Sequence, residues 1–280
     1  MTRWIIVGAG YTGARVAALV AARGDTVVVT RRTLAAAQTV APAGATARAL
    51  DLDPAANDPL ADLFGPGDLV VITAAPTDAE ARGDQRLAAA ARAAGVARIV
   101  YVSSTGVYAA AGGEPVAEDF TLAPRSATGG PRLVAEAALR ASGVPTVALR
   151  AAGIYGPERG IVARMRAGTY RAIGDGLTAA SRIHVDDLAA AIVAAGVHRA
   201  PLPVYNVADD EPGPSRELVE AAMAAFSLPA PPTVAVAAVE PRVAAMVTAD
   251  RRIDNTRLRQ HLGLALRYPS WRAALAAGAM

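Results

Sequence analysis

The segment from Ile5 to Gly13 constrains the fold of this chain more than any other. It reads Ile-Ile-Val-Gly-Ala-Gly-Tyr-Thr-Gly, an apolar strand followed at once by a G-x-G-x-x-G turn, and an apolar-periodic stretch continues over residues 12–22. A strand, a glycine turn and a helix in this order are the context in which the glycines predict dinucleotide binding. Such turns also join strands to helices in many other α/β proteins, which is the alternative.

Each residue of the turn has an expected role. Gly8 allows the tight turn, Gly10 lets the backbone approach a pyrophosphate, and Gly13 lets the helix pack closely on the strand. Tyr11 and Thr12 begin the helix, whose unpaired N–H groups and positive dipole end would face the phosphates.

Two arginines follow the second predicted strand, which covers residues 26–30. NAD-binding proteins usually carry Asp or Glu at this point, roughly 20 residues after the glycine turn, to bind the ribose 2′-hydroxyl. This chain has Arg31 and Arg32 there, two planar cations suited to a 2′-phosphate. We therefore predict NADP(H) over NAD(H) as the cofactor, with a merely solvated arginine pair as the alternative.

Composition excludes several kinds of chemistry. The chain has 280 residues and no Cys, and all 28 of its Lys+Arg residues are Arg. Disulfides, thiolate metal sites, a Cys nucleophile and any lysine-dependent step are thereby ruled out. The three histidines lie far apart in the sequence, without metal-ligand spacing, so we expect no metal site.

The charge and the hydropathy pattern bear on partners and location. The net charge is only +3 and the arginines are scattered, which gives little support for nucleic-acid binding. No apolar run approaches the roughly 18 residues of a membrane-spanning helix. Residues 1–4 lead directly into the first strand and leave no room for a signal peptide, so we expect a cytoplasmic protein that acts on a small molecule.

Apolar strands alternate with Ala-rich helices, which predicts an α/β fold with a doubly wound parallel sheet (Rossmann fold) and a small C-terminal substrate-side lobe. Strands are expected at residues 4–7, 26–30, 46–49, 69–72, 98–102, 147–150 and 204–207, and helices most clearly at 12–22, 79–94, 131–141, 185–197 and 215–226. We assign residues 1–153 plus 182–207 to the dinucleotide-binding domain and residues 154–181 plus 208–280 to the smaller lobe.

Ligands of such sheets bind beyond the carboxyl ends of the strands. Asp51 follows the third strand, where it could accept a hydrogen bond from an adenine amino group or simply form a turn. Ala74 and Ala75 follow the fourth strand and are small enough to let a cofactor pass. A cluster of hydroxyl side chains, residues 103–108, follows the fifth strand, and helix capping alone does not explain it.

At this point the chain resembles the extended short-chain dehydrogenase/reductase superfamily, whose members include NAD(P)-dependent epimerases, dehydratases and reductases. The resemblance rests on five motifs in the order of the family, namely Gly8–Gly13, Val102–Tyr108, Arg150–Pro157, Arg182–Leu188 and Tyr205–Val207. It implies that Ser104 holds the catalytic Ser/Thr position, that the region around Ile154 lies near the nicotinamide, and that a homodimer through a four-helix interface is plausible.

The catalytic pair of the family is altered. Its chemistry normally depends on Tyr-x-x-x-Lys, one helical turn apart, and a chain without lysine cannot contain that pair. Thr128 and Arg132 hold the corresponding places, and Pro131 at the expected first helical position puts Thr128 before the helix. Gly153 stands where many nucleotide-sugar enzymes of the family have Asn. The resemblance is therefore to atypical members, and it argues against a nucleotide-sugar substrate.

These observations support more than one function. The favoured hypothesis is an NADP(H)-dependent reductase or dehydrogenase of a small carbonyl or related substrate, with Tyr155 or Tyr108 as proton donor, Ser104 orienting the substrate and Arg132 binding the ribose or a substrate anion. Each tyrosine could instead pack with its hydroxyl satisfied, and His184 could line the pocket rim or anchor a strand-to-helix junction. A non-enzymatic NADP(H) sensor is the alternative, and an epimerase or dehydratase is less expected.

Overall fold

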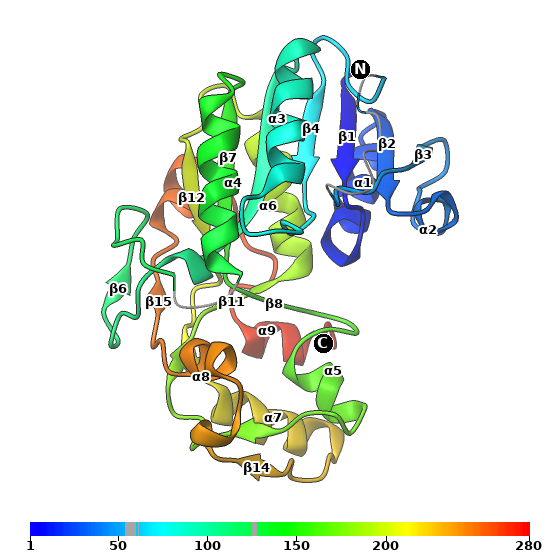
Figure 1. Cartoon of the computed structure of the whole chain (residues 1–280). Helices are drawn as coiled ribbons and strands as arrows, with labels where there is room; N and C mark the ends of the chain where they lie inside the picture. The colour runs from blue at the N-terminus through cyan, green and yellow to red at the C-terminus, as the bar shows by residue number, and fades with distance from the viewer. Residues whose placement is uncertain (54–59, 61, 125–127) are drawn as a thin grey trace. The chain divides into compact units, whose positions relative to one another are not determined.

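A seven-stranded parallel sheet forms the centre of the structure, a computed structural model that describes residues 1–53, 60, 62–124 and 128–280 (Figure 1). The order across the sheet is β12 (Val204–Val207), β7 (Thr146–Ala151), β5 (Arg98–Ser104), β4 (Leu69–Ile72), β1 (Arg3–Val7), β2 (Thr26–Arg31) and β3 (Thr46–Ala49). The predicted doubly wound α/β sheet is confirmed, and the bounds of β3, β4 and β12 are those expected from the sequence.

Helices cover both faces of this sheet. Figure 1 shows α3 (Arg82–Ala93) and α4 (Gly129–Ala141) on one face and α1 (Tyr11–Ala22) and α6 (Val185–Val197) on the other, while the short α2 (Leu34–Gln38) joins β2 to β3. Helix α3 begins three residues later than predicted. Ala81 adopts a left-handed conformation with φ of 51°, and the carboxylate of Asp78 accepts hydrogen bonds from the N–H groups of Glu80 and Arg82, so the chain turns before the helix starts.

The chain divides into two compact units. The first unit comprises residues 1–104, 130–150 and 188–205, and the second comprises residues 105–129, 151–187 and 206–280. The second unit therefore takes in more of the chain than the predicted lobe did. Its larger extent has a physical cause, because β6 (Pro115–Val116) pairs with β15 (Arg252–Ile253) and β8 (Gly153–Tyr155) pairs with β11 (Arg182–His184).

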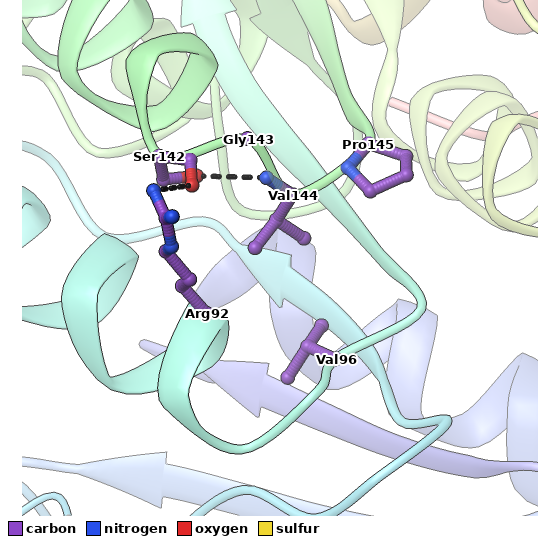
Figure 2. Close-up of a pocket in the computed structure, with 6 residues that line it drawn as sticks. All are labelled: Arg92, Val96, Ser142, Gly143, Val144 and Pro145. Carbon is purple, nitrogen blue, oxygen red and sulfur yellow. Dashed lines mark hydrogen bonds between the residues drawn. The ribbon is translucent and has the colours of Figure 1, made fainter.

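A shallow hollow opens at the amino-terminal edge of the sheet in the first unit (Figure 2). It is lined by Arg92, Val96, Ser142, Gly143, Val144 and Pro145. Arg92 Nη1 donates to the carbonyl oxygen of Ser142 over 3.2 Å. Because these residues precede β5 and β7, the hollow lies at the edge opposite the carboxyl ends of the strands, where ligands of parallel sheets bind.

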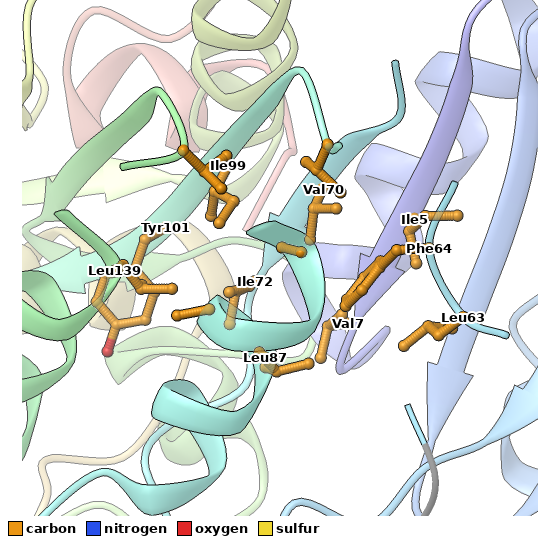
Figure 3. Close-up of a cluster of buried hydrophobic side chains, with 14 of the residues drawn as sticks. Ile5, Val7, Leu63, Phe64, Val70, Ile72, Leu87, Ile99, Tyr101 and Leu139 are labelled. Atoms are coloured by element: carbon orange, nitrogen blue, oxygen red, sulfur yellow. The ribbon is translucent and has the colours of Figure 1, made fainter. Parts of the chain in front are cut away.

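The core of the first unit lies between the sheet and the helices α3 and α4 (Figure 3). Strand residues such as Ile5, Ile72 and Ile99 pack against Leu87 of α3 and Leu139 of α4, which are 1% and 0% exposed. Each such buried leucine stabilises the fold by about 1.5–3 kcal/mol. Arg98, at the start of β5, links this strand to the end of α6 by hydrogen bonds. Its Nη1 donates to the carbonyl oxygens of Ala195, Gly196 and His198.

The second unit has a separate core. Its helices are α5 (Ile161–Arg166), α7 (Ser215–Phe226), α8 (Pro241–Val247) and α9 (Trp271–Ala276), with single turns η1 (Thr105–Val107), η2 (Val236–Ala238) and η3 (Arg257–His261). Two further two-residue pairs complete it, β9 (Ala172–Ile173) with β14 (Thr233–Val234) and β10 (Ala179–Ala180) with β13 (Gly213–Pro214). Tyr155, Met165, Leu218 and Trp271 are among the residues of its core. Across the described residues, every helix is too short or too polar to cross a bilayer.

Candidate functional site

The glycine turn joins β1 to α1 in a shape that only small residues allow. Gly8 has φ of +81°, and a Cβ on it would lie 2.8 Å from both the N and the Cβ of Ala74. A Cβ on Gly13 would lie 2.8 Å from Thr73 Oγ1. Thr73 in turn donates to the carbonyl oxygen of Gly8 over 2.6 Å. The turn is therefore packed tightly against Thr73 and Ala74, the two residues that follow β4.

Gly10 differs from the other two glycines. The only described atom within 4 Å of a Cβ built on it is the Gly8 carbonyl oxygen, at 3.8 Å. Gly10 is also the N-cap residue of the twelve-residue helix α1, and a glycine has no side chain that could cap the N–H groups of the first turn. Open backbone at the positive end of a helix suits the pyrophosphate of a dinucleotide.

Thr30 fixes the end of β2 against this turn. The N–H of Gly8 donates to Thr30 Oγ1 over 3.2 Å, and the N–H of Ala9 donates to the Thr30 carbonyl oxygen over 2.8 Å. Arg31 and Arg32 come next in the chain, half-buried and exposed respectively. Within the described part of the chain, no carboxylate forms an ion pair with either arginine. The edge of the site therefore carries two cations whose charge is available to a ligand.

The remaining predicted cofactor residues lie at the start of α1 and after the strands β3 and β4. Thr12 is buried, and the ring of Tyr11 stacks under the guanidinium of Arg15, whose carbon lies 4.1 Å from the ring centre. Ala75 is exposed beyond β4. The carboxylate of Asp51 accepts a hydrogen bond from the N–H of Asp53 over 3.0 Å, which is the turn geometry that the sequence left open beside adenine binding.

A buried ionic network holds the carboxyl end of β5. Glu136 of α4 forms an ion pair with Arg150 of β7 over 2.8 Å, both side chains being 4% exposed. It also accepts a hydrogen bond from Ser103 Oγ. Ser104, the last residue of β5, is partly exposed next to this network. The network thus fixes Ser103, the residue before Ser104, at the carboxyl end of β5.

Arg132 lies beside the same strand end. Its Nη1 donates to the carbonyl oxygen of Val102 over 2.6 Å, and the side chain is half-buried. Helix α4 begins at Gly129, two residues before the predicted start at Pro131, and exposed Thr128 precedes it. Thr128 is therefore outside the helix, as the proline indicated, while Arg132 is in its first turn.

Tyr108 is wholly buried in the second unit. Its hydroxyl donates to Asn206 Oδ1 over 2.7 Å. Asn206 Nδ2 donates in turn to the carbonyl oxygens of Val116 and Asp254. This arrangement is that of a packed tyrosine with a satisfied hydroxyl, the alternative to a proton donor.

Tyr155 is 3% exposed, and its hydroxyl donates to Asp209 Oδ2 over 3.4 Å. Burial raises the pKa of Asp209 to about 8. Burial, with the neighbouring charge of Asp209, also raises the pKa of Tyr155 well above its ordinary value. An acid whose proton is held this firmly is a weak donor near neutral pH.

His184 anchors the junction of β11 and α6. It is 0% exposed, its Nε2 lies 2.9 Å from the carbonyl oxygen of Ala279, and its Nδ1 accepts from the N–H of Asp186. Nε2 must carry the proton, because a carbonyl only accepts. The ring also packs against Tyr155 and Tyr268. The sequence left two roles open for His184, and the structure shows that it anchors the strand-to-helix junction.

Two buried carboxyls were missed by the sequence reasoning. Asp84 is 2% exposed, and its position on α3 could have revealed it, because Asp84, Leu87, Ala88 and Ala91 form the buried stripe of that helix. Asp209 is 1% exposed and comes just after β12. Its signal in the sequence is its place directly after an apolar strand, where ligands of parallel sheets bind.

Residues 8–198 match a family model described as NAD(P)H-binding. The chain belongs to this NAD(P)H-binding family. Its structural and curated relatives include members of the extended short-chain dehydrogenase/reductase superfamily, the one that the five motifs indicated.

Three curated relatives carry names of enzymes. A 3-diazoavenalumate denitrifying reductase from Streptomyces sp is 32% identical over 69% of this chain and 68% of the relative. A UDP-glucose 4-epimerase from Mycolicibacterium smegmatis is 32% identical over 65% of this chain and 61% of the relative. A 2-alkyl-3-oxoalkanoate reductase from Stenotrophomonas maltophilia is 34% identical over 52% and 50%. The chain thus spans about half to two thirds of their length.

The NAD(P)H-binding protein also has a full-length structural counterpart. A conserved protein of unknown function from Silicibacter pomeroyi has a TM-score of 0.82 and 31% identity, and the similarity covers 100% of this chain and 99% of the other. The similarity extends beyond residues 8–198, so the second unit belongs to the shared fold as well.

Proposed function

We propose that this NAD(P)H-binding protein is an NADP(H)-dependent reductase, or dehydrogenase in the reverse direction, of a small carbonyl or related substrate. The preference for NADP(H) rests on Arg31 and Arg32. They directly follow Thr30, whose hydroxyl and carbonyl oxygens accept hydrogen bonds from the glycine turn. Two relatives named reductases support the reaction class.

A ribose 2′-phosphate fits this edge better than a 2′-hydroxyl. The hydroxyl would call for a carboxylate at the end of β2, and the chain offers two guanidinium groups instead. A guanidinium presents several N–H donors in a fixed plane that matches phosphate oxygens. Arg31 gains precision because it is still part of β2, whose register with β3 extends to Arg31 and Ala49.

We assign the remaining roles in cofactor and substrate binding to residues at the strand ends. Bound NADPH would supply a hydride to the substrate. The glycine turn would bind the pyrophosphate, Ser104 would hydrogen-bond the substrate oxygen, and Arg132 would bind the ribose or a substrate anion while staying charged. Tyr108 and Tyr155 remain candidate proton donors, but each must first leave a buried hydrogen bond, so Ser104 is the first residue to test.

The cofactor preference is tested by binding titrations of NADPH and NADH, followed by the quenching of tryptophan fluorescence. We expect tighter binding of NADPH, and a loss of about 10- to 100-fold in its affinity in the double variant Arg31→Gln, Arg32→Gln, because charge-assisted bonds to phosphate are lost. Arg23→Gln is the matched control, since Arg23 follows α1 at its far end. Equal affinity of the wild-type protein for the two cofactors would refute the preference.

The reaction is tested by NADPH oxidation against a panel of small ketones, aldehydes and diazo compounds. We expect Ser104→Ala to lower kcat by about 100- to 1,000-fold while the affinity for NADPH stays the same. A Ser104→Thr variant keeps a hydroxyl and should retain part of the activity. If Ser104→Ala turns over at the wild-type rate, Ser104 does not act on the substrate.

A sensor without enzymatic activity is the second candidate. The buried, hydrogen-bonded hydroxyls of Tyr108 and Tyr155 favour it, because neither tyrosine stands ready as an acid. This candidate predicts NADPH binding without turnover of any compound in the panel, together with a change in oligomeric state on binding. Turnover of one panel compound that depends on Ser104 would exclude it.

A further inference from the structure

The last residues of β5 extend beyond the neighbouring strand β4. The register of the two strands ends with Ile72 opposite Tyr101, and Ile72 is the last residue of β4. Strand β5 continues to Ser104, and on its other side it borders β7. Residues 102–104, which we call the overhang, therefore lie past the hydrogen-bond ladder to β4, and their position depends on other contacts.

Helix α4 contacts the overhang through two side chains that are one helical turn apart. Arg132 Nη1 donates to the carbonyl oxygen of Val102 over 2.6 Å, and Glu136 Oε1 accepts a hydrogen bond from Ser103 Oγ. Residues at positions i and i+4 of a helix lie on the same face. One face of α4 thus holds two successive residues of the strand.

The carboxylate that accepts the Ser103 hydrogen bond is itself held firmly. Arg150 of β7 donates to Glu136 from Nε to Oε1 over 3.2 Å and from Nη2 to Oε2 over 2.8 Å. A bidentate arginine fixes the plane of a carboxylate as well as its position. All three side chains are buried. Ser103 is therefore bonded to an acceptor whose place is set by both α4 and β7.

Stability alone does not explain a serine at position 103. The residues before it in β5 are buried and include Ile99, Val100 and Val102. Buried ion pairs often contribute no more stability than apolar residues of similar size, so an apolar network would serve this core as well. The bond from a hydroxyl to a carboxylate is directional. Because successive side chains of a strand point to opposite faces, a Ser103 that is fixed toward α4 turns Ser104 to the other face.

We propose that Ser103 is a positioning residue for Ser104. Its hydrogen bond to the Glu136–Arg150 pair holds the overhang so that the Ser104 hydroxyl meets the substrate oxygen. This rests on the proposed function, in which Ser104 binds that oxygen. A donor to a reacting oxygen has to lie within about 0.5 Å of its productive position, and a misplacement of about 1 Å can cost about 100-fold in rate.

The first test is kinetic and uses a panel compound that the wild-type protein reduces. We expect Ser103→Ala to lower kcat by about 10-fold while the affinity for NADPH stays within about twofold. Ser103→Thr keeps the hydroxyl and should restore most of kcat. In the double variant Ser103→Ala, Ser104→Ala, kcat should be no lower than in Ser104→Ala alone, because Ser103 acts through Ser104.

Ser142→Ala is the matched control for these variants. Ser142 lies just after α4, and its Oγ donates to the carbonyl oxygen of Leu139. This variant also loses one serine hydrogen bond in the first unit, and it should keep the wild-type kcat. All rates are compared at a temperature where circular dichroism shows every variant folded. A Ser103→Ala protein that melts earlier but keeps the wild-type kcat overturns the proposal, and so does a double variant in which the two losses multiply.

The second test needs no turnover. Crystal structures of the wild-type protein, Ser103→Ala and Ser103→Thr are compared without cofactor. In Ser103→Ala we expect Ser104 Oγ to move by about 0.5 Å or more, or to occupy more than one rotamer, and in Ser103→Thr to stay in place. An unmoved, singly ordered Ser104 in Ser103→Ala overturns the proposal.

The two proposals fail in different ways. If the wild-type protein reduces no panel compound, the proposed function is wrong, and the comparison of crystal structures still decides whether Ser103 positions Ser104. If turnover depends on Ser104 but is the same in Ser103→Ala as in the wild type, the positioning role is wrong and the proposed function stands.

Discussion

Replacing Asp209 by Asn should make the protein more stable, and increasingly so as the pH rises. Asp209 is 1% exposed in the second unit, and burial raises its pKa from 3.8 to about 8. Asn has nearly the same shape and carries no charge. Its amide N–H can donate to the Tyr155 hydroxyl while its oxygen accepts from the N–H of Glu211, so both hydrogen bonds of Asp209 have a counterpart.

The magnitude follows from proton linkage. Between about pH 4 and pH 8 the folded protein keeps the Asp209 proton and the unfolded chain has lost it, so this group lowers stability by about 1.4 kcal/mol per pH unit. Below pH 4 both states are protonated, and above pH 8 both are ionised, so the penalty stops growing. From pH 5 to pH 9, the stability of Asp209→Asn relative to wild type should therefore increase by about 4 kcal/mol.

Urea denaturation at one-unit steps from pH 5 to pH 9 measures this difference. Trp271 is buried in the core of the second unit and Trp4 in the first, so a Trp4→Phe background makes the fluorescence report on the second unit. Asp175→Asn, at an exposed position of the same unit, is the control. A constant difference between Asp209→Asn and wild type across this range would show that Asp209 is ionised in the folded protein and would refute the reasoning.

Three further substitutions test the geometry of the fold. Gly8→Ala places a Cβ 2.8 Å from Ala74 at a φ of +81°, so it should cost about 1–3 kcal/mol of stability by thermal unfolding and abolish NADPH binding. Glu136→Gln leaves Arg150 buried without its counter-charge and should cost about 3–5 kcal/mol in denaturant unfolding. Tyr108→Phe leaves Asn206 Oδ1 without its donor and should cost about 1–3 kcal/mol by the same measurement, while a cost near zero would show that water replaces the hydroxyl.

The sequence predicted the sheet well because its strands are continuous apolar runs bounded by turn residues. The strand Leu69–Ile72 is such a run, and its bounds needed no information from elsewhere in the chain. The strand Pro115–Val116 has only two residues and depends on pairing with Arg252–Ile253, more than 130 positions later. No local periodicity signals a two-residue strand, so the extent of the second unit could not be predicted.

The glycine turn and its arginines could be read from the sequence because their roles depend on local spacing. The environments of the buried acids and of His184 could not be predicted from the sequence. The position of the His184 ring depends on the carbonyl of Ala279, 95 positions away, and the partner of Tyr155 is Asp209, 54 positions away. Which polar group faces another inside a core is decided by tertiary packing, and the pattern of a single helix or strand does not encode it.

The absence of lysine limits which groups of this protein can change their charge near neutral pH. In a Tyr-x-x-x-Lys pair, the cation itself can be tuned, since the pKa of a lysine falls readily on burial. A guanidinium is not deprotonated in proteins, so Arg132 cannot serve as the adjustable group. A response to pH near neutrality must then come from another group, and in the first unit burial raises the pKa of the Asp84 carboxyl to about 7. An arginine in the lysine position thus supplies a charge that does not change with pH, whereas a lysine could be tuned by burial.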